Sequence, residues 1–239
     1  MLVAILSDIH GNLEALEAVW ADMASFPVDE IVSLGDMVGY GPDPEEVLRS
    51  VRERRVRCCM GNHELGIVSP TQRSWFNPTA LKGLDLTAAL LSAESRQFIA
   101  ALPRFLLLEG ARFVHGFPPE SVNTYLFQVE DFRIEDWLVR GERLTFVGHT
   151  HELMLVCWTG SEIERRELGP GVFALDDGRR IVNAGSVGQP RDGNNNAKYL
   201  LWDTGRGSVD VRFVPYDIET TVDKIRERGF PSYYGSRLW

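Results

Sequence analysis

The sequence lacks a surplus of positive charge, since 25 Lys and Arg residues stand against 34 Asp and Glu residues and the formal net charge is −9. Without a basic field to attract phosphates at long range, binding to a nucleic-acid polymer or to an anionic membrane is disfavoured. A bound cation can still supply positive charge locally. We therefore expect a small phosphorylated substrate and no nucleic-acid partner.

Cysteine is scarce. The three cysteines, Cys58, Cys59 and Cys157, match neither a C-x-x-C redox motif nor a zinc site. Adjacent residues of a strand point to opposite faces, so Cys58 and Cys59 are expected to be small apolar core residues. A reducing cytoplasm is the simplest setting for such a chain.

Long apolar runs are also missing. The apolar run that begins at Met1 ends at Asp8, too short for a signal peptide, and no later segment approaches the length of a membrane span. We expect no membrane association. With 239 residues, of which 44% are hydrophobic, the chain is long enough for one sizeable core, and we expect a single domain over residues 1–239.

Short apolar runs alternate with helical patterns in the first part of the chain. Strands are predicted over residues 2–6, 30–34 and 56–60, and amphipathic helices over residues 12–25 and from Asp43 to about Arg54. Polar motifs follow each of these strands directly. Because loops converge at the carboxyl ends of parallel strands, we expect these motifs to lie together at one edge of a sheet.

The second part of the chain has a more mixed pattern. It predicts helices over residues 80–101, interrupted by a cap at Ser92, and near 130–139 and 217–228, a hairpin around Glu109-Gly110, and a strand over 144–148. From residue 153 onward, short strands are separated by turn signals at Asp177-Gly178 and Thr204-Gly205. This pattern predicts a second, more antiparallel sheet.

All five histidines lie in four short motifs: Asp8-Ile9-His10, Gly61-Asn62-His63, His115-Gly116 and Gly148-His149-Thr150-His151. Gly35-Asp36 adds a further carboxylate. Such hard oxygen and borderline nitrogen ligands suit manganese, iron, zinc or nickel. Seven ligands exceed what one ion usually takes from a protein, so two ions that share a bridging carboxylate fit better.

Taken in sequence order, the four histidine motifs and Gly35-Asp36 make five motifs. They resemble the motifs of the calcineurin-like metallophosphoesterases. The segment from Asn183 to Arg191 resembles the corresponding segment of their small prokaryotic phosphodiesterase branch. The resemblance implies an α/β fold, which some schemes class as α+β. The expected architecture is a four-layer αββα sandwich, with two mixed β-sheets flanked by helices and a dinuclear metal site at the carboxyl ends of the strands.

The resemblance also implies how the ligands are divided. One ion would be bound by Asp8, His10 and His151 and the other by Asn62, His115 and His149, with Asp36 bridging. The expected cofactors are two divalent or transition metal ions, manganese first and iron, zinc or nickel as alternatives.

His63 is the histidine left over from both ligand sets, and it follows Asn62 directly. We expect it to act as a general acid for the leaving oxygen, with Glu64 orienting it, and a structural role is the alternative. Arg191 could bind a substrate phosphate through its planar guanidinium or form a surface salt bridge. Trp75 and Phe76 could stack on a base or anchor a local core.

The expected function is that of a metal-dependent phosphodiesterase or phosphatase, acting on a small organic phosphate such as a nucleotide or cyclic nucleotide by attack of a metal-bridging hydroxide. Ser/Thr protein phosphatases of the superfamily have Asp and Arg where Gly39 and Tyr40 stand, which disfavours that activity. The alternatives are a diadenosine polyphosphate hydrolase and, in another class, a noncatalytic scaffold with the same fold.

Overall fold

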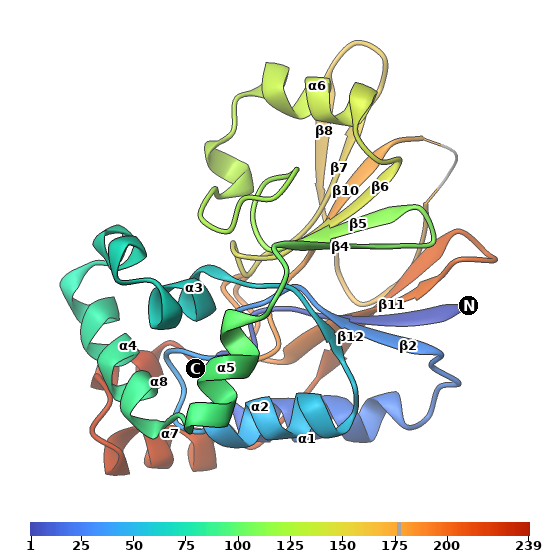
Figure 1. The fold of residues 1–239 in the computed structure, drawn as a ribbon. Coiled ribbons are helices and arrows are strands. Elements are labelled where there is room, and N and C mark those ends of the chain that lie inside the picture. Colours follow the sequence, from blue (N-terminus) through green and yellow to red (C-terminus); the bar gives the residue numbers. More distant parts are fainter. Residues whose placement is uncertain (176–177) are drawn as a thin grey trace.

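Two β-sheets pack face to face in the computed structural model, which describes residues 1–175 and 178–239, and helices cover their outer faces (Figure 1). Among the described residues the first sheet has the strand order β3-β2-β1-β11-β12-β9 and the second the order β4-β5-β6-β10-β7-β8. Both sheets mix parallel and antiparallel pairs. The predicted layered α/β architecture with two mixed sheets is confirmed.

The strands have the following bounds: β1 Leu2–Leu6, β2 Glu30–Ser33, β3 Arg57–Cys58, β4 Phe105–Leu108, β5 Ala111–Val114, β6 Leu144–Val147, β7 Leu153–Trp158, β8 Ile163–Glu167, β9 Gly171–Ala174, β10 Arg180–Ala184, β11 Ala197–Asp203 and β12 Ser208–Val214. The helices are α1 Leu13–Met23, α2 Pro44–Glu53, α3 Asn62–Val68, α4 Pro78–Leu90, α5 Ala93–Ala100, α6 Asp131–Arg140, α7 Ile218–Glu227 and α8 Ser232–Ser236, with short 3₁₀ helices at Pro70–Trp75 and Leu126–Gln128. None of the described helices is long and apolar enough to cross a membrane.

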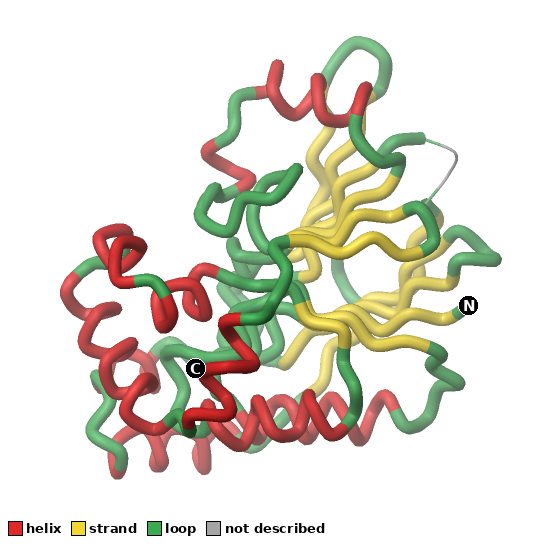
Figure 2. The backbone as a smooth tube through the Cα atoms, in the orientation of Figure 1, coloured by secondary structure: helices red, strands yellow, loops and turns green. Residues whose placement is uncertain are grey.

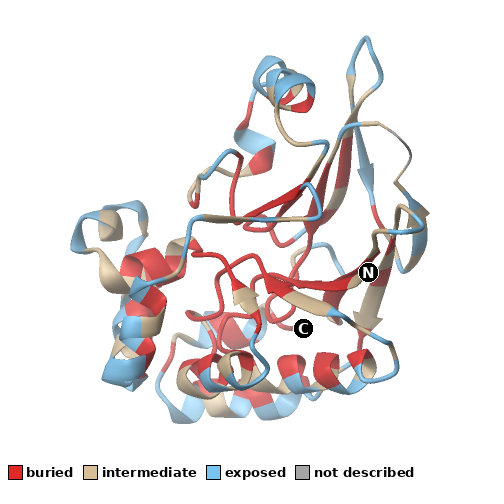
Figure 3. Ribbon diagram, turned by 45° about the vertical axis from the view of Figure 1, so that its right-hand side comes forward, coloured by how far each residue is buried: buried red, intermediate tan, exposed pale blue. Residues whose placement is uncertain are grey.

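Strand β1 shows why the apolar runs of the sequence form central strands. Val3 and Ile5 belong to the core between the two sheets, whereas Ala4 and Leu6 belong to the core between the first sheet and its helices. Because alternate side chains point to opposite faces, a strand buried on both sides needs a continuous apolar sequence. The buried strands of both sheets are visible at the centre of Figure 3.

Capping residues set the helix boundaries much as predicted. The Asn12 side chain accepts a hydrogen bond of 3.1 Å from the Ala15 N–H at the start of α1, and Pro44 occupies the first turn of α2. The predicted break at Ser92 is confirmed, since its hydroxyl caps α5 by accepting the Ser95 N–H. Cys58 and Cys59 are buried, as expected.

The prediction that the strands after residue 153 form a separate sheet is wrong. Strand β10 pairs in parallel with β6, and β11 pairs antiparallel with β1, so the second part of the chain completes both sheets. Strand apolarity predicts burial but does not specify the pairing partner. Strand β3 is also shorter than the predicted run over residues 56–60, and Asp177 of the first predicted turn lies outside the described residues.

The topology places the functional loops. Strands β1, β2 and β3 are parallel to one another in the first sheet, and β5, β6 and β10 are parallel in the second. The loops that follow these strands gather at one end of the sandwich, in the seam between the two sheets (Figure 2).

Candidate metal centre

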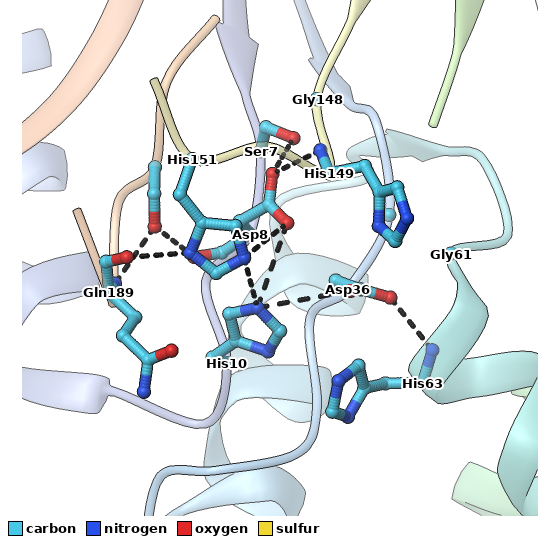
Figure 4. A network of polar contacts seen from close by, with 12 residues as sticks. Ser7, Asp8, His10, Asp36, Gly61, His63, Gly148, His149, His151 and Gln189 are labelled. Carbon is cyan, nitrogen blue, oxygen red and sulfur yellow. Dashed lines mark hydrogen bonds and ion pairs between the residues drawn. The ribbon is translucent and has the colours of Figure 1, made fainter. Parts of the chain in front are cut away.

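Every ligand predicted from the sequence follows a strand of one of these two parallel sets. They are Asp8 and His10 after β1, Asp36 after β2, Asn62 after β3, His115 after β5, and His149 and His151 after β6. The structure brings all seven together in two adjoining groups, part of which is drawn in Figure 4. The convergence at the carboxyl ends of the strands thus agrees with the sequence-based expectation.

The loops that carry these ligands have an unusual backbone. Five ligands adopt left-handed conformations, with φ of 52° at Asp8, 51° at His10, 53° at Asp36, 67° at His149 and 64° at His151. Left-handed backbone costs about 1 kcal/mol for most L-residues, although Asp and His tolerate it better than average. Such conformations cluster at functional sites, where the surrounding structure holds them in place.

The first group contains Asp8, His10 and His151. The Nε2 atoms of His10 and His151 lie 3.1 Å apart, and Asp8 Oδ1 lies 3.2 Å from His151 Nε2 and 3.6 Å from His10 Nε2. All three side chains are buried. Asp8 Oδ1 has no hydrogen-bond partner, and it faces the other two ligand atoms.

The second group surrounds His115. Its Nε2 lies 3.1 Å from Asn62 Oδ1, 3.2 Å from His149 Nδ1 and 3.2 Å from Asp36 Oδ2. The same Asp36 oxygen lies 3.8 Å from His10 Nε2 of the first group. A single carboxylate oxygen therefore faces both groups, which is the position of a bridging ligand.

In each of the four candidate ligand histidines, one ring nitrogen faces away from the centre, and its contact defines the tautomer of the ring. His10 Nδ1 contacts Val38 O at 3.1 Å, His115 Nδ1 contacts Leu34 O at 3.2 Å, His149 Nε2 contacts Asn123 O at 3.2 Å and His151 Nδ1 contacts Gln189 O at 2.6 Å. A carbonyl oxygen only accepts, so each outward nitrogen carries the hydrogen and donates it. The inward nitrogen of each neutral ring then presents a lone pair to the centre.

Two metal cations fit this arrangement. Imidazole nitrogens, carboxylates and an amide oxygen face one another at about hydrogen-bonding distance, and there are too few hydrogens between them to satisfy every pair. A buried acceptor such as Asp8 Oδ1 is costly without a donor or a cation. A cation in each group would satisfy these atoms, and nitrogen with hard oxygen ligands suits manganese, iron, zinc or nickel.

The charges of the metal-free centre are strongly coupled. Burial lowers the pKa of a histidine, but the neighbouring Asp36 carboxylate outweighs it and raises the pKa of His115 to about 9. Burial raises the pKa of Asp36, and the nearby His115 overcomes this effect and holds the pKa well below its usual range. Burial, together with the nearby His115, lowers the pKa of His149 to about 4.

His63 lies beside the two groups. Its main-chain N–H donates a hydrogen bond of 2.8 Å to Asp36 Oδ1, and its ring packs against Tyr40, with centroids 4.5 Å apart, and Phe76 at 5.1 Å. Its Nδ1 is buried without a partner and faces Gly39, where a Cβ atom would lie only 2.0 Å away. Burial lowers the pKa of His63 to about 3.

Glu64 does not orient His63, contrary to the sequence-based expectation. Its buried carboxylate accepts backbone N–H groups of Asp36 and Met37 at 2.7 Å, Val38 at 3.1 Å and Gly61 at 2.8 Å. Both oxygens are thus used by the main chain. Glu64 ties the loop of the bridging Asp36 to the loop that carries Asn62.

Sequence reasoning missed several supporting side chains. The Ser7 hydroxyl donates to Asp8 Oδ2 at 2.5 Å, and the Ser186 hydroxyl donates to Asp8 O at 2.8 Å. Asn183 Nδ2 donates to Gly148 O at 2.9 Å and to Thr150 Oγ1 at 2.8 Å. The family-like segment that begins at Asn183 was visible in the sequence, but its position against both ligand loops was not.

Arg191 lies against the first group and makes no ion pair with the described residues. Its main-chain N–H donates to His151 O at 3.2 Å, its guanidinium donates to Gln189 Oε1 at 3.1 Å, and its Nε is buried without a partner. The alternative of a surface salt bridge is therefore wrong within the described part of the chain. Trp75 is 70% exposed, and Phe76 packs on His63.

Replacing Glu64 tests its bracing role. In Glu64→Gln the amide group would meet two backbone N–H donors that now bond to a carboxylate oxygen, so we expect a loss of about 3 kcal/mol of stability and weaker metal retention. Denaturant unfolding and elemental analysis would measure both. Glu17→Gln, on an exposed position of α1, is the matched control and should leave both unchanged. Equal metal content in the two variants would contradict this role.

The raised pKa of His115 predicts proton release on metal loading. In metal-free protein the stabilisation from protonated His115 is fully present below pH 6.5 and is lost as the pH rises through about 9. At pH 8 a metal ion must displace this proton, so about one proton should be released per chain. Calorimetric titration of Mn²⁺ in buffers with different ionisation enthalpies measures it. Release that is unchanged in His115→Asn would contradict the prediction.

Comparison with known proteins agrees with the geometry. A family model described as the calcineurin-like phosphoesterase superfamily domain matches residues 1–207. The uncharacterised protein MJ0912 of Methanocaldococcus jannaschii is 34% identical over 100% of this chain and 97% of its own length. A metallophosphoesterase from Sphaerobacter thermophilus, known from its crystal structure, is 35% identical with a TM-score of 0.86, and the match covers 100% of this chain and 98% of that one.

Another relative is named for its activity. The symmetrical bis(5′-nucleosyl)-tetraphosphatase of Pseudomonas putida is 25% identical, and the match covers 89% of this chain and 68% of the relative. The family match over most of the chain, together with the two convergent ligand groups, identifies this chain as a member of the calcineurin-like phosphoesterase superfamily.

Proposed function

We propose that this chain hydrolyses phosphate esters of small organic molecules, with nucleotides and cyclic nucleotides as the expected class, and that it uses two metal ions. The observation that carries the proposal is the pair of buried ligand groups that share Asp36 Oδ2. All seven expected ligands are present at these groups. A noncatalytic scaffold would have no need to retain them, which argues against that alternative.

The ligand groups indicate how each residue would act. When bound, the two ions would supply Lewis acidity that activates a water molecule and neutralises phosphoryl oxygens. Asp8, His10 and His151 would hold one ion, and Asn62, His115 and His149 the other. Asn62 is a neutral ligand, so it leaves more positive charge at the centre than a carboxylate would. Manganese is the ion proposed first.

His63 would assist departure of the leaving group. One ring nitrogen lies within 4.8 Å of the ligand atoms of His10 and Asp36, so the ring reaches the centre. With a pKa of about 3 caused by burial, the free ring is neutral at neutral pH. The negative charge of a bound phosphate would favour its protonated form, which could then pass a proton to the leaving oxygen.

Symmetrical hydrolysis of bis(5′-nucleosyl) tetraphosphates is the second candidate function. A relative carries that activity in its name. A cavity of about 280 Å³ beside Arg191, lined also by Arg237 and Trp239, offers a further cation and an aromatic ring for a second part of such a substrate. We infer that the protein acts as one domain in a reducing cytoplasm in either case.

Metal analysis followed by ester hydrolysis tests the proposal. Purified protein should hold about two ions per chain and hydrolyse bis-(p-nitrophenyl) phosphate or p-nitrophenyl phosphate when Mn²⁺, Ni²⁺, Zn²⁺ or Mg²⁺ is supplied. The ratio of the two rates separates diesterase from monoesterase preference. Diadenosine tetraphosphate converted to ADP alone would favour the second candidate. A protein with fewer than one ion and no turnover with any metal would refute the proposal.

His63→Ala tests proton transfer. The variant should keep its metal content, because His63 lies outside both proposed ligand sets, while its rate falls by about 10² to 10⁴. The loss should be larger for an alkyl phosphate ester than for the p-nitrophenyl ester, because p-nitrophenolate leaves without a proton. Steady-state rates on both esters, with elemental analysis, measure this. Unchanged turnover on the alkyl ester would remove His63 from the mechanism.

A further inference from the structure

The candidate ligands of the metal centre are almost completely covered by the residues that pack on them. Asp8, His10, Asp36, His115 and His151 are each at most 2% exposed. The cavity that reaches His10, bounded by Tyr40, Gln189 and Tyr234 among others, measures only about 10 Å³. This is about the space needed for one water molecule, and the lining residues Thr221, Ile225 and Leu238 place this cavity on the side of the C-terminal segment.

Two tyrosine rings form much of this cover, one over each ligand group. The Tyr40 ring lies 4.6 Å from the His10 ring and 4.5 Å from the His63 ring, between centroids. The Tyr125 ring stacks on His149, with centroids 3.8 Å apart and planes at 16°. The apolar ring faces thus pack on histidines, and the polar ends of both tyrosines are left for another partner.

That partner is Arg191, which enters from a third loop. Its positive charge is near enough to both tyrosine hydroxyls to oppose the rise that burial causes in their pKa values. The Arg191 main chain is attached to His151, and its buried Nε has no hydrogen-bond partner. No carboxylate within the described residues pairs with this guanidinium. The loops after β2, β5 and β10 therefore place two tyrosines and an arginine without a carboxylate partner among the described residues against candidate ligand histidines.

An anion suits this point better than any other ligand. A guanidinium beside a centre that binds metal cations experiences repulsion, which an incoming phosphoryl group would relieve. A phenolic hydroxyl carries its proton at neutral pH and can donate a hydrogen bond. Charge-assisted hydrogen bonds of this kind are the strong ones.

We propose that Tyr40, Arg191 and Tyr125 form a phosphoryl-binding cover, in which both tyrosine hydroxyls and the guanidinium bond to phosphoryl oxygens directed away from the metal ligands. The inference rests on the proposed function only in requiring a metal-loaded centre. The negative net charge of the chain disfavours a polymeric phosphate, so the expected occupant is the phosphate group of a small molecule.

The test measures binding of inorganic phosphate to the Mn²⁺-loaded full chain by calorimetry. Tyr40→Phe and Tyr125→Phe each remove one hydroxyl, and phosphate affinity should fall by about tenfold in each. Arg191→Gln should lower it by about a hundredfold. The matched controls are Tyr233→Phe, at a 56% exposed residue, and Arg206→Gln, whose side chain is 85% exposed; both should bind phosphate as the unmodified chain does.

Metal content and the unfolding midpoint are measured on the same samples. Weaker phosphate binding with unchanged Mn²⁺ content supports the cover. Affinities within twofold of the unmodified chain in all three variants would overturn it, and so would losses that only follow a loss of Mn²⁺. If the phosphate affinities change as expected while no ester is hydrolysed by the unmodified chain, the cover stands and the proposed hydrolysis fails.

Discussion

Four imidazole lone pairs directed at one another in a buried space are the constraint on which this structure depends. Each ring donates its outward N–H to a main-chain carbonyl and so presents an acceptor to the centre. Two carboxylates and an amide oxygen add further acceptors. Such a cluster is unfavourable unless cations enter it, so the fold must hold the ligands in place until they do.

The sandwich provides this rigidity by bringing two sets of parallel strand ends into one seam. Continuous apolar strands hold both sheets in the core, and the ligands follow immediately, within a few residues of each strand end. Left-handed backbone at five ligands turns the chain sharply. The Glu64 carboxylate and the Ser186 hydroxyl form hydrogen bonds with the main chain of Asp36 and Asp8, in neighbouring loops. These bonds between loops offset the unfavourable free energy of the left-handed conformations.

The cover above the ligands depends on the same convergence. Tyr40, Tyr125 and Arg191 are far apart in the sequence, and each follows a strand that ends at the seam. Gly39 has a related effect on His63. Its lack of a side chain leaves room for the imidazole, and no carboxylate stands there to orient it. His63 is thus held by ring contacts with Tyr40 and Phe76 and by a main-chain hydrogen bond to Asp36.

The helix caps and the position of the candidate ligands after strand ends were predictable from the sequence, because each depends on local chemistry. Asp8, Asp36 and the four ligand histidines stand in short motifs directly after apolar runs, and Asn12 and Ser92 cap helices through neighbouring N–H groups. The resemblance of five ordered motifs to one family supplied the layered fold. The pairing of β10 with β6 and of β11 with β1 was not predictable. An apolar sequence indicates that a strand is buried, but it does not specify which strand pairs with it.

The sequence by itself indicated which side chains are candidate metal ligands and that they meet at strand ends, since residue type and spacing along a strand carry that information. Tertiary structure alone decided what Glu64 contacts, which tautomer each candidate ligand histidine adopts, and that Tyr40, Tyr125 and Arg191 all lie against these histidines. These features depend on distances between loops separated by many residues. Such distances are set by how the two sheets pack, and no local sequence pattern specifies them.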